Sequence, residues 1–313
     1  MRGRDRNIGA RVSLAAAVLA LAAAAALAGE QVVFFDDFET TPVGTLPANW
    51  QIIYGGRAGE QKVTQDVAHS GVRSLQLWGW PGWSALVIRN FASTSPLLGY
   101  EFAIRIAERN VSAANAEHPG FYCHRCENYW GTYYALTQFN HAYLEVRSET
   151  EIPIGTWQPG TWYRVRALLD RTLRTYGVWL DGEPVAAGLP IWYLHPDQIQ
   201  ALGLVAAHAG VKVYYDDVKV FVPGPEETAG ILGDEVAALV DGGTLTVGLG
   251  TALTAKLDHA LDKLARGQTE PAFAMLQAFV DQVGELVGDG VLTPAQGQRL
   301  IELANLVLTG AQA

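Results

Sequence analysis

Two pairs of adjacent aspartates are the first residues in this chain that could do chemistry. Asp36 and Asp37 lie in FFDDFE, which also contains Glu39, and Asp216 and Asp217 lie in KVYYDDVKV. Both stretches have the alternation of a strand, so one carboxylate of each pair is expected on each face of its strand. A buried carboxylate is costly unless a positive or hydrogen-bonding group meets it. The sequence therefore requires a partner for these acids.

A second candidate site is the aromatic stretch SLQLWGWPGW. Alternation places Leu75 and Leu77 toward a core, and it places Trp78 and Trp80 on the opposite, polar face. Neighbouring exposed aromatics form an apolar platform on which the C–H face of a sugar ring can stack. The alternative is that both Trp side chains pack under the long loop around Cys123 or inside a second sheet.

A third candidate is the stretch FNHAYLEVRSETE, read as one strand. One of its faces would carry His141, Tyr143, Glu145, Arg147, Glu149 and Glu151. The first four could bond sugar hydroxyls beside the Trp residues if this strand lies in the same sheet. Carboxylates two residues apart are separated by about 6.5–7 Å, which is near the spacing of paired acids in inverting glycosidases. Glu145, Glu149 and Glu151 are therefore the alternative catalytic residues.

The catalytic hypothesis competes with a simpler interpretation of that strand. Arg147 lies among the acids and would hold its neighbours ionised, whereas a glycosidase needs one of them protonated. A solvated strand face with a local salt bridge explains the same residues without catalysis. We therefore predict no catalytic residues and keep the glutamates as the alternative.

Cys123 and Cys126 lie in FYCHRCENYWG, a stretch rich in Gly and aromatic residues that indicates a loop. A redox motif would open a helix after a strand, and zinc would need further ligands. His118 and His124 are available as such ligands, but their spacing is unusual. A disulfide that closes a short loop is the prediction for an oxidising compartment.

The elements that must position these residues change along the chain. All nine Trp lie within residues 31–222, in short alternating segments separated by turn signals, which predicts a mainly β sandwich or jelly roll. Residues 223–227, PGPEE, indicate an extended, polar linker. Leucines at helical spacing then predict a small bundle of three or four helices over residues 228–310. No internal repeat is apparent.

The N-terminus predicts a secreted protein. Arginines precede an apolar run that ends in Ala-Leu-Ala, so residues 1–28 have the features of a signal peptide, and the run is short for a membrane span. The formal net charge of −10 disfavours nucleic acid and anionic membrane as partners. We expect neither nucleic-acid binding nor membrane insertion.

The β region resembles the concanavalin A-like lectin and glucanase sandwiches, especially laminin G-like modules. The stretches that carry the resemblance are FFDDFE, AHSGVRSLQL, QPGTWYRVRALLD, VWLDGEPV and KVYYDDVKVF. The C-terminal region resembles the FIMAH domain of secreted bacterial proteins, in LTAKLDHALDKLARG, AFAMLQAFVDQV and LTPAQGQRLIELAN. The Glu-x-Asp-x-Glu motif of the concanavalin-type glucanases is absent.

The resemblance also implies a partner for the acids. In these sandwiches the first and last strands are neighbours, so Asp36, Asp37, Glu39, Asp216 and Asp217 would converge and could hold a structural Ca²⁺. The alternative is that the acids accept backbone hydrogen bonds without metal. The fold is not specific for a ligand, because it hosts lectins, glycosidases, lyases and adhesion modules. We expect non-catalytic binding of a polysaccharide or other glycan, with a glycan hydrolase or lyase, or a module that binds a cell-surface protein, as alternatives.

Overall fold

The computed structural model describes residues 29–80, 84–108, 120–123, 132–134, 137–139, 143–147, 151–191, 199–206 and 210–310. The described chain divides into two compact units, one over Val32–Val222 and the other over residues 223–310 together with residues 29–31. The first unit is built of strands and the second of helices.

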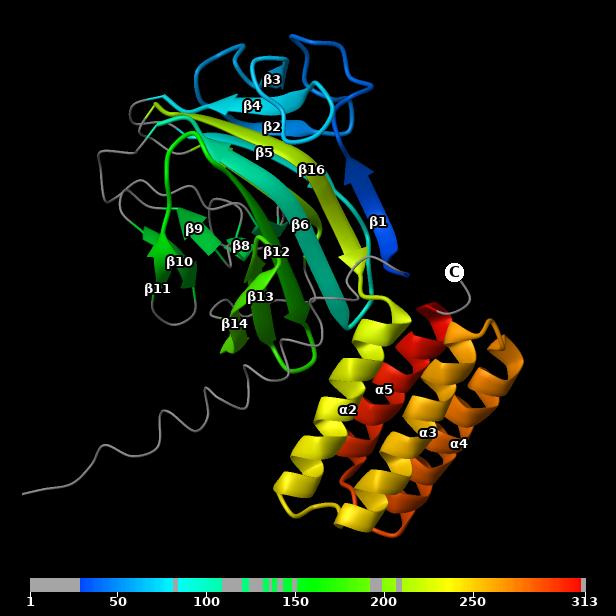
Figure 1. Ribbon diagram of the computed structural model, residues 1–313. Helices are drawn as coiled ribbons and strands as arrows, with labels where there is room; N and C mark the ends of the chain where they lie inside the picture. The colour runs from blue at the N-terminus through cyan, green and yellow to red at the C-terminus, as the bar shows by residue number, and fades with distance from the viewer. Residues whose placement is uncertain are drawn as a thin grey trace, which may run out of the picture. The chain divides into compact units, whose positions relative to one another are not determined.

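The β unit is an antiparallel sandwich (Figure 1). Its eight-stranded sheet has the order β14 (Glu183–Pro190), β13 (Thr175–Leu180), β12 (Trp162–Asp170), β6 (Leu97–Ile106), β16 (Lys212–Val222), β4 (Ser74–Trp78) and β3 (Lys62–Thr64), and β1 (Gln31–Asp36) pairs with β16. The five-stranded sheet has the order β2 (Gln51–Gly55), β5 (Ala85–Asn90), β15 (Ala201–Ala206), β7 (Gly120–Cys123) and β8 (Thr132–Tyr134). A three-stranded sheet contains β11 (Glu151–Thr156), β10 (Tyr143–Arg147) and β9 (Thr137–Phe139).

The core lies between the two larger sheets. Along β6 the alternate residues Tyr100, Phe102 and Ile104 are fully buried in it. Tyr215 on β16 donates its hydroxyl to the carbonyl of Val205 on β15, with an O···O distance of 2.7 Å, and so links one sheet to the other. The predicted β-sandwich is confirmed, and its first and last strands pair as the resemblance implies.

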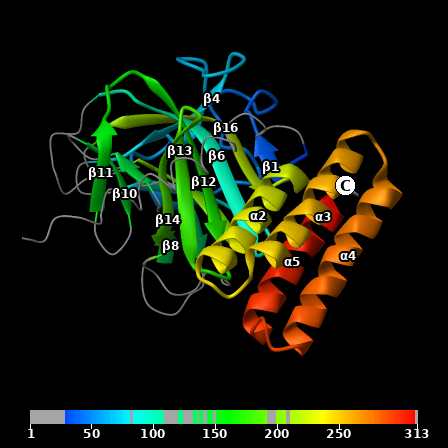
Figure 2. The ribbon, with the colours of Figure 1, turned by 60° about the horizontal axis from the view of Figure 1, so that its bottom comes forward.

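The second unit is a bundle of four helices, which confirms the predicted helical bundle (Figure 2). Its helices are α2 (Pro225–Asp241), α3 (Val247–Ala265), α4 (Thr269–Gly288) and α5 (Pro294–Gly310). Pro225 is at the start of α2, where its fixed φ suits the first turn and its missing N–H is not needed. Residues 225–227 are therefore helical, whereas the sequence predicted an extended linker there.

The bundle contains an internal repeat that the sequence analysis missed. Leu239–Gly250 (LVDGGTLTVGLG) and Leu286–Gly297 (LVGDGVLTPAQG) connect α2 to α3 and α4 to α5 with the same hydrogen bonds. Gly243 and Gly290 both have φ of 72°, a left-handed conformation that ends each first helix. The repeat is hard to recognise in the sequence, because the two segments share only the residues of the turn and of the close contact between the helices.

Candidate functional site

A β-bulge in β16 determines where the adjacent side chains of Asp216 and Asp217 point. The register of β16 against β6 shifts between Asp216 and Lys219, and Asp217 has a left-handed φ of 48°. The bulge turns both carboxylates toward one turn: Asp216 Oδ2 accepts the backbone N–H groups of His69 and Ser70, at 2.8 and 3.1 Å. Asp217 bonds the side chains of the same two residues. The expectation of one acid on each face was therefore wrong.

Asp216 is fully buried, and its pKa reflects this environment. Desolvation raises the pKa of the carboxyl from 3.8 to about 6, and the neighbouring charge of Asp217 adds to the rise. The backbone N–H groups of Ser70, His69 and Asp217 act in the opposite direction, because they favour the ionised form.

The acids of the first motif have separate partners. Glu39 Oε1 accepts the backbone N–H groups of Val72 and Arg73, at 2.8 and 2.7 Å. Asp37 accepts the N–H of Glu39 itself, at 3.1 Å, in a local turn. The turn over residues 69–73 is therefore held at its beginning by Asp216 and Asp217 and at its end by Glu39.

Asp36 points to a different set of partners. Its Oδ2 atom accepts Trp50 Nε1 at 2.8 Å and lies 3.1 Å from Arg89 Nη1. Desolvation lowers the pKa of Arg89, and the charge and hydrogen bond of Asp36 act in the opposite direction. Asp36 is thus neutralised by a cation of the protein itself.

This arrangement does not fit the predicted calcium site. The five acids bond four separate sets of groups and do not converge on one point, whereas Ca²⁺ needs six to eight oxygen ligands around it. Within the described residues, no group of three or more His, Cys, Asp or Glu side chains could hold a metal ion. The geometry favours the alternative in which the acids accept backbone hydrogen bonds.

We therefore expect calcium and a chelator to leave the thermal midpoint of the sandwich unchanged. A metal that binds only the folded state would raise this midpoint by mass action. Calorimetric melts of the chelator-treated protein, with and without added Ca²⁺, test the expectation. A midpoint that rises with Ca²⁺ and falls again with chelator would restore the calcium prediction.

The strand that carries Trp78 is covered along most of its length. Leu75 and Leu77 are fully buried in the core, as predicted. On the other face Ser74 donates to the carbonyl of Val67, and Gln76 donates to Glu60, so loops cover the polar residues as well. The aromatic residues at the end of the strand are what remains accessible on this face.

Trp78 and Trp80 form a surface with two cations. The guanidinium carbon of Arg57 lies 4.1 Å from the centroid of the Trp78 ring and 5.4 Å from that of Trp80. Lys212 Nζ lies 4.5 Å from the Trp78 ring. Trp80 is 50% exposed, whereas Trp78 is partly buried and donates its Nε1–H to the carbonyl of Gly210 at 2.6 Å. We call Arg57, Trp78, Trp80 and Lys212 the tryptophan platform.

Gln61 holds the loop that presents Arg57. This side chain is 5% exposed, and its Nε2 donates to the carbonyls of Gly55 and Arg57 at 2.6 and 2.8 Å. Its Oε1 accepts the N–H of Trp78 at 2.9 Å, so one amide fixes both the loop and the end of β4. The Arg57 N–H also bonds the Trp78 carbonyl at 2.9 Å. The backbone that carries Arg57 and Trp78 is therefore held by hydrogen bonds within the protein.

A tight turn at Gly56 brings the loop to this place. Gly56 has a left-handed φ of 47°, and a Cβ atom there would overlap the Trp78 carbonyl oxygen and the side chain of Ala85. Only glycine fits such a position. Arg57, Gln61 and Lys212 were not predicted as site residues, because each reaches the site through contacts with distant segments. The Gly55-Gly56 pair, which indicates a tight turn, was the one local feature that pointed to this loop.

The strand with the other predicted ligand residues is not in the sheet of Trp78. β10, with Tyr143, Glu145 and Arg147, pairs with β9 and β11 and is drawn away from β4 (Figures 1 and 2). The condition for these residues to assist the Trp pair is thus not met. The register places Arg147 opposite Glu151, the third alternative acid.

His141, Glu149 and Cys126 lie outside the described residues, as do the possible zinc ligands His118 and His124. Cys123 ends β7, where its backbone is opposite Thr132. Its disulfide with Cys126 stays a prediction.

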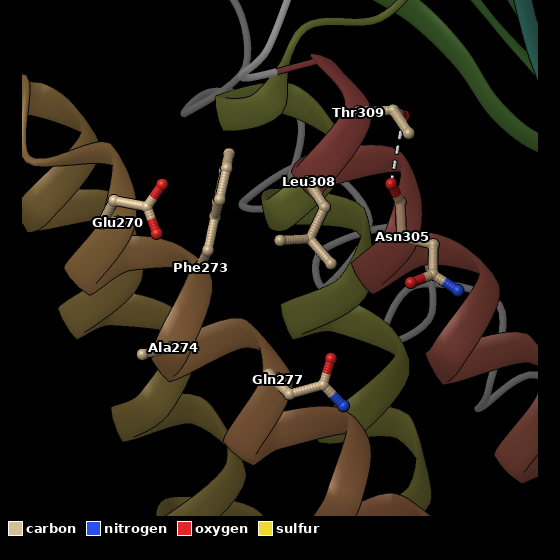
Figure 3. A pocket seen from close by; sticks show the side chains of 7 residues that line it. All are labelled: Glu270, Phe273, Ala274, Gln277, Asn305, Leu308 and Thr309. Carbon is tan, nitrogen blue, oxygen red and sulfur yellow. Dashed lines mark hydrogen bonds between the residues drawn. The ribbon is translucent and has the colours of Figure 1, made fainter.

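The bundle carries two open grooves. One, of ≈ 520 Å³, lies between α4 and α5, and Figure 3 shows Phe273 on α4 and Leu308 on α5 among its lining residues. The other, of ≈ 360 Å³, lies between α2 and α3. Neither is lined by a catalytic set of side chains. Among the described residues, no helix has the length and apolar character to cross a membrane.

Fold and sequence together define a two-unit protein, an antiparallel β-sandwich followed by a helical bundle. Residues 229–309 match the family model of the FIMAH domain, so the bundle is a FIMAH domain. No curated protein matches the chain.

Solved structures similar to this chain share little sequence with it. A sialidase is 16% identical, with a TM-score of 0.46, over 67% of this chain and 21% of that one. The catalytic domain of the glycoside hydrolase family 131 protein from Coprinopsis cinerea is 15% identical, with a TM-score of 0.44, over 61% and 94% of the two chains. The binding domain of botulinum neurotoxin DC, in complex with SialylT, is 10% identical, with a TM-score of 0.41, over 62% and 48%. Likenesses this distant carry no argument about the ligand.

Proposed function

We propose that the protein is a secreted, non-catalytic glycan-binding protein, whose sandwich binds carbohydrate at the tryptophan platform. The exposed indole of Trp80, beside Trp78 and two cations, is the observation that supports it. A large aromatic that is half exposed offers an apolar surface on which the face of a sugar ring can stack.

Carbohydrate suits this surface better than an apolar ligand does. A sugar ring has C–H groups on its faces and hydroxyls around its edge, so it can stack on Trp80 while polar side chains bond its rim. Arg57 and Lys212 supply hydrogen-bond donors next to the indole. The combination of one apolar face and adjacent donors is what an amphipathic ring needs.

The groups around the platform do not support catalysis. Its nearby carboxylate is Glu60, whose pKa is lowered, chiefly by a hydrogen bond from Lys62. A carboxylate held ionised in this way is a poor general acid, because it carries no proton to give to a leaving group. Binding is therefore the function that these residues support.

Trp80→Ala is expected to weaken polysaccharide binding by about tenfold or more, because it removes the stacking surface. The fold should survive, since Trp80 is 50% exposed. Isothermal titration of the full chain with a panel of soluble polysaccharides measures the effect, and circular dichroism checks the fold. Phe35→Ala is the matched control, because Phe35 is 49% exposed on β1.

The panel also distinguishes the alternatives. Release of reducing sugar from any polymer would contradict the non-catalytic assignment. Equal binding by the Trp80→Ala variant and the wild-type protein would exclude the platform as the site. Binding to a cell-surface protein that persists after its glycans are removed would identify a protein ligand instead.

A further inference from the structure

The tryptophan platform carries more positive charge than its packing needs. Within the described residues, the contacts of the Arg57 guanidinium are the rings of Trp78 and Trp80, with no carboxylate bound to it. Arg57 itself is an exposed residue. A guanidinium above an aromatic face keeps its N–H donors around its edge, where a ligand can reach them.

Lys212 adds a second cation at the same ring. Its Nζ lies over Trp78, and its charge contributes to the lowered pKa of Glu60. Glu60 in turn forms its ion pair with Lys62, at 2.9 Å. Lys62 and Lys212 thus both act on the one carboxylate of Glu60, while Arg57 lies over the rings, so the local charge at this end of β4 is positive.

The positive charge is local, because the chain as a whole has a formal net charge of −10. A polyanion would be repelled by most of this surface, so any polyanion that binds must gain specific contacts. Two like charges fixed around one indole also repel each other, and an anionic group between or beside them would relieve that repulsion.

We propose that the platform selects acidic polysaccharides, with an oxyanion of the sugar accepting hydrogen bonds from Arg57 next to Lys212 while the sugar ring stacks on Trp80. This inference rests on the proposed glycan-binding function and specifies its ligand class. Arg is suited to the role, because its planar fork can bond a carboxylate or sulfate in a bidentate manner. The backbone of Arg57 is already held by Gln61 and Trp78, and its guanidinium lies against the two indole rings.

Matched polymers test the charge without changing the sugar backbone. The full chain is titrated with polygalacturonate and with the same polymer after reduction of its carboxyl groups to alcohols. Dextran sulfate and dextran form the second pair, so that a carboxylate and a sulfate are examined separately. We expect one acidic polymer to bind at least about tenfold more tightly than its neutral partner, with a dependence on salt.

Variants then assign the preference to Arg57. Arg57→Gln should weaken binding of the acidic polymer by about tenfold and binding of its neutral partner by much less, because glutamine can still donate a hydrogen bond to a hydroxyl but carries no charge. Arg57→Lys, which keeps the charge but not the fork, should have an intermediate effect. Arg174→Gln removes the same charge from an exposed arginine in the β12–β13 turn and should have no effect.

The outcomes separate this inference from the function on which it rests. Equal binding of acidic and neutral polymers, with loss on Trp80→Ala, overturns the acidic preference and keeps the platform. A preference for acid that survives Arg57→Gln overturns the role of Arg57. Failure to bind any polymer overturns the glycan-binding function itself.

Discussion

Asp216→Ala is expected to lower the free energy of unfolding of the sandwich by about 3 kcal/mol near pH 5, because it removes an acceptor for three backbone N–H groups. These belong to His69, Ser70 and Asp217, and they fix the turn that packs on β16. The carboxyl is fully buried, so its removal also leaves a cavity. No surface substitution in this unit should cost as much.

The cost of this substitution should shrink as the pH rises. Burial raises the pKa of Asp216 to about 6 in the folded state, from 3.8. The folded state therefore binds the proton more tightly, and its stability falls as pH rises through the interval from 3.8 to about 6. A shift of this size corresponds to about 3 kcal/mol at most. The alanine variant lacks this group and should lose nothing in the same interval.

Denaturant unfolding of the full chain, followed by Trp fluorescence, measures the effect. All nine Trp lie in the β region, so their fluorescence reports on the sandwich and not on the helices. The difference between wild type and variant is compared from pH 4 to pH 8, which cancels the other titrating groups. Asp216→Asn keeps an acceptor oxygen without the charge and should cost less than alanine. A difference that is independent of pH would contradict the raised pKa.

The acid pairs show what sequence can and cannot predict about this fold. Strand alternation and the resemblance correctly predicted that FFDDFE and KVYYDDVKV lie on neighbouring strands. The partners of the acids were not predictable, because the bulge at Asp217 changes the direction of the side chains that follow it. Arg89, which neutralises Asp36, comes from a strand of the opposite sheet.

The tryptophan platform, too, was predictable from the sequence only in part. Alternation along SLQLWGW placed the two Leu residues in the core, and the exposure of Trp80 agrees with the predicted polar face. The partners of the indoles come from the β2–β3 loop and from β16. Such long-range pairs leave no local periodicity, so a single sequence does not reveal them. The prediction that residues of β10 assist the Trp pair was wrong, because β10 pairs with its neighbours β9 and β11 in a separate sheet.

The repeat in the FIMAH domain leads to the second large effect. Gly250 on α3 and Gly297 on α5 are equivalent in the two hairpins, and both are buried. A Cβ atom on Gly297 would overlap a methyl group of Val287, and one on Gly250 would overlap the equivalent Val240. Glycine is therefore needed at both places for the helices to approach closely.

Gly297→Ala is expected to destabilise the helical bundle by about 2–3 kcal/mol, because Val287 is β-branched and cannot turn its methyl group away without strain. The matched control is Gly284→Ala on α4, where a Cβ would meet nothing within 4 Å. That change should instead stabilise by about 0.5–1 kcal/mol, through helix propensity alone. Thermal melts followed by far-ultraviolet circular dichroism report on the helices, and Val287→Ala combined with Gly297→Ala should recover part of the loss. Equal effects of the two glycine substitutions would mean that the helices separate easily, and the close approach at Gly297 would then not stabilise the bundle.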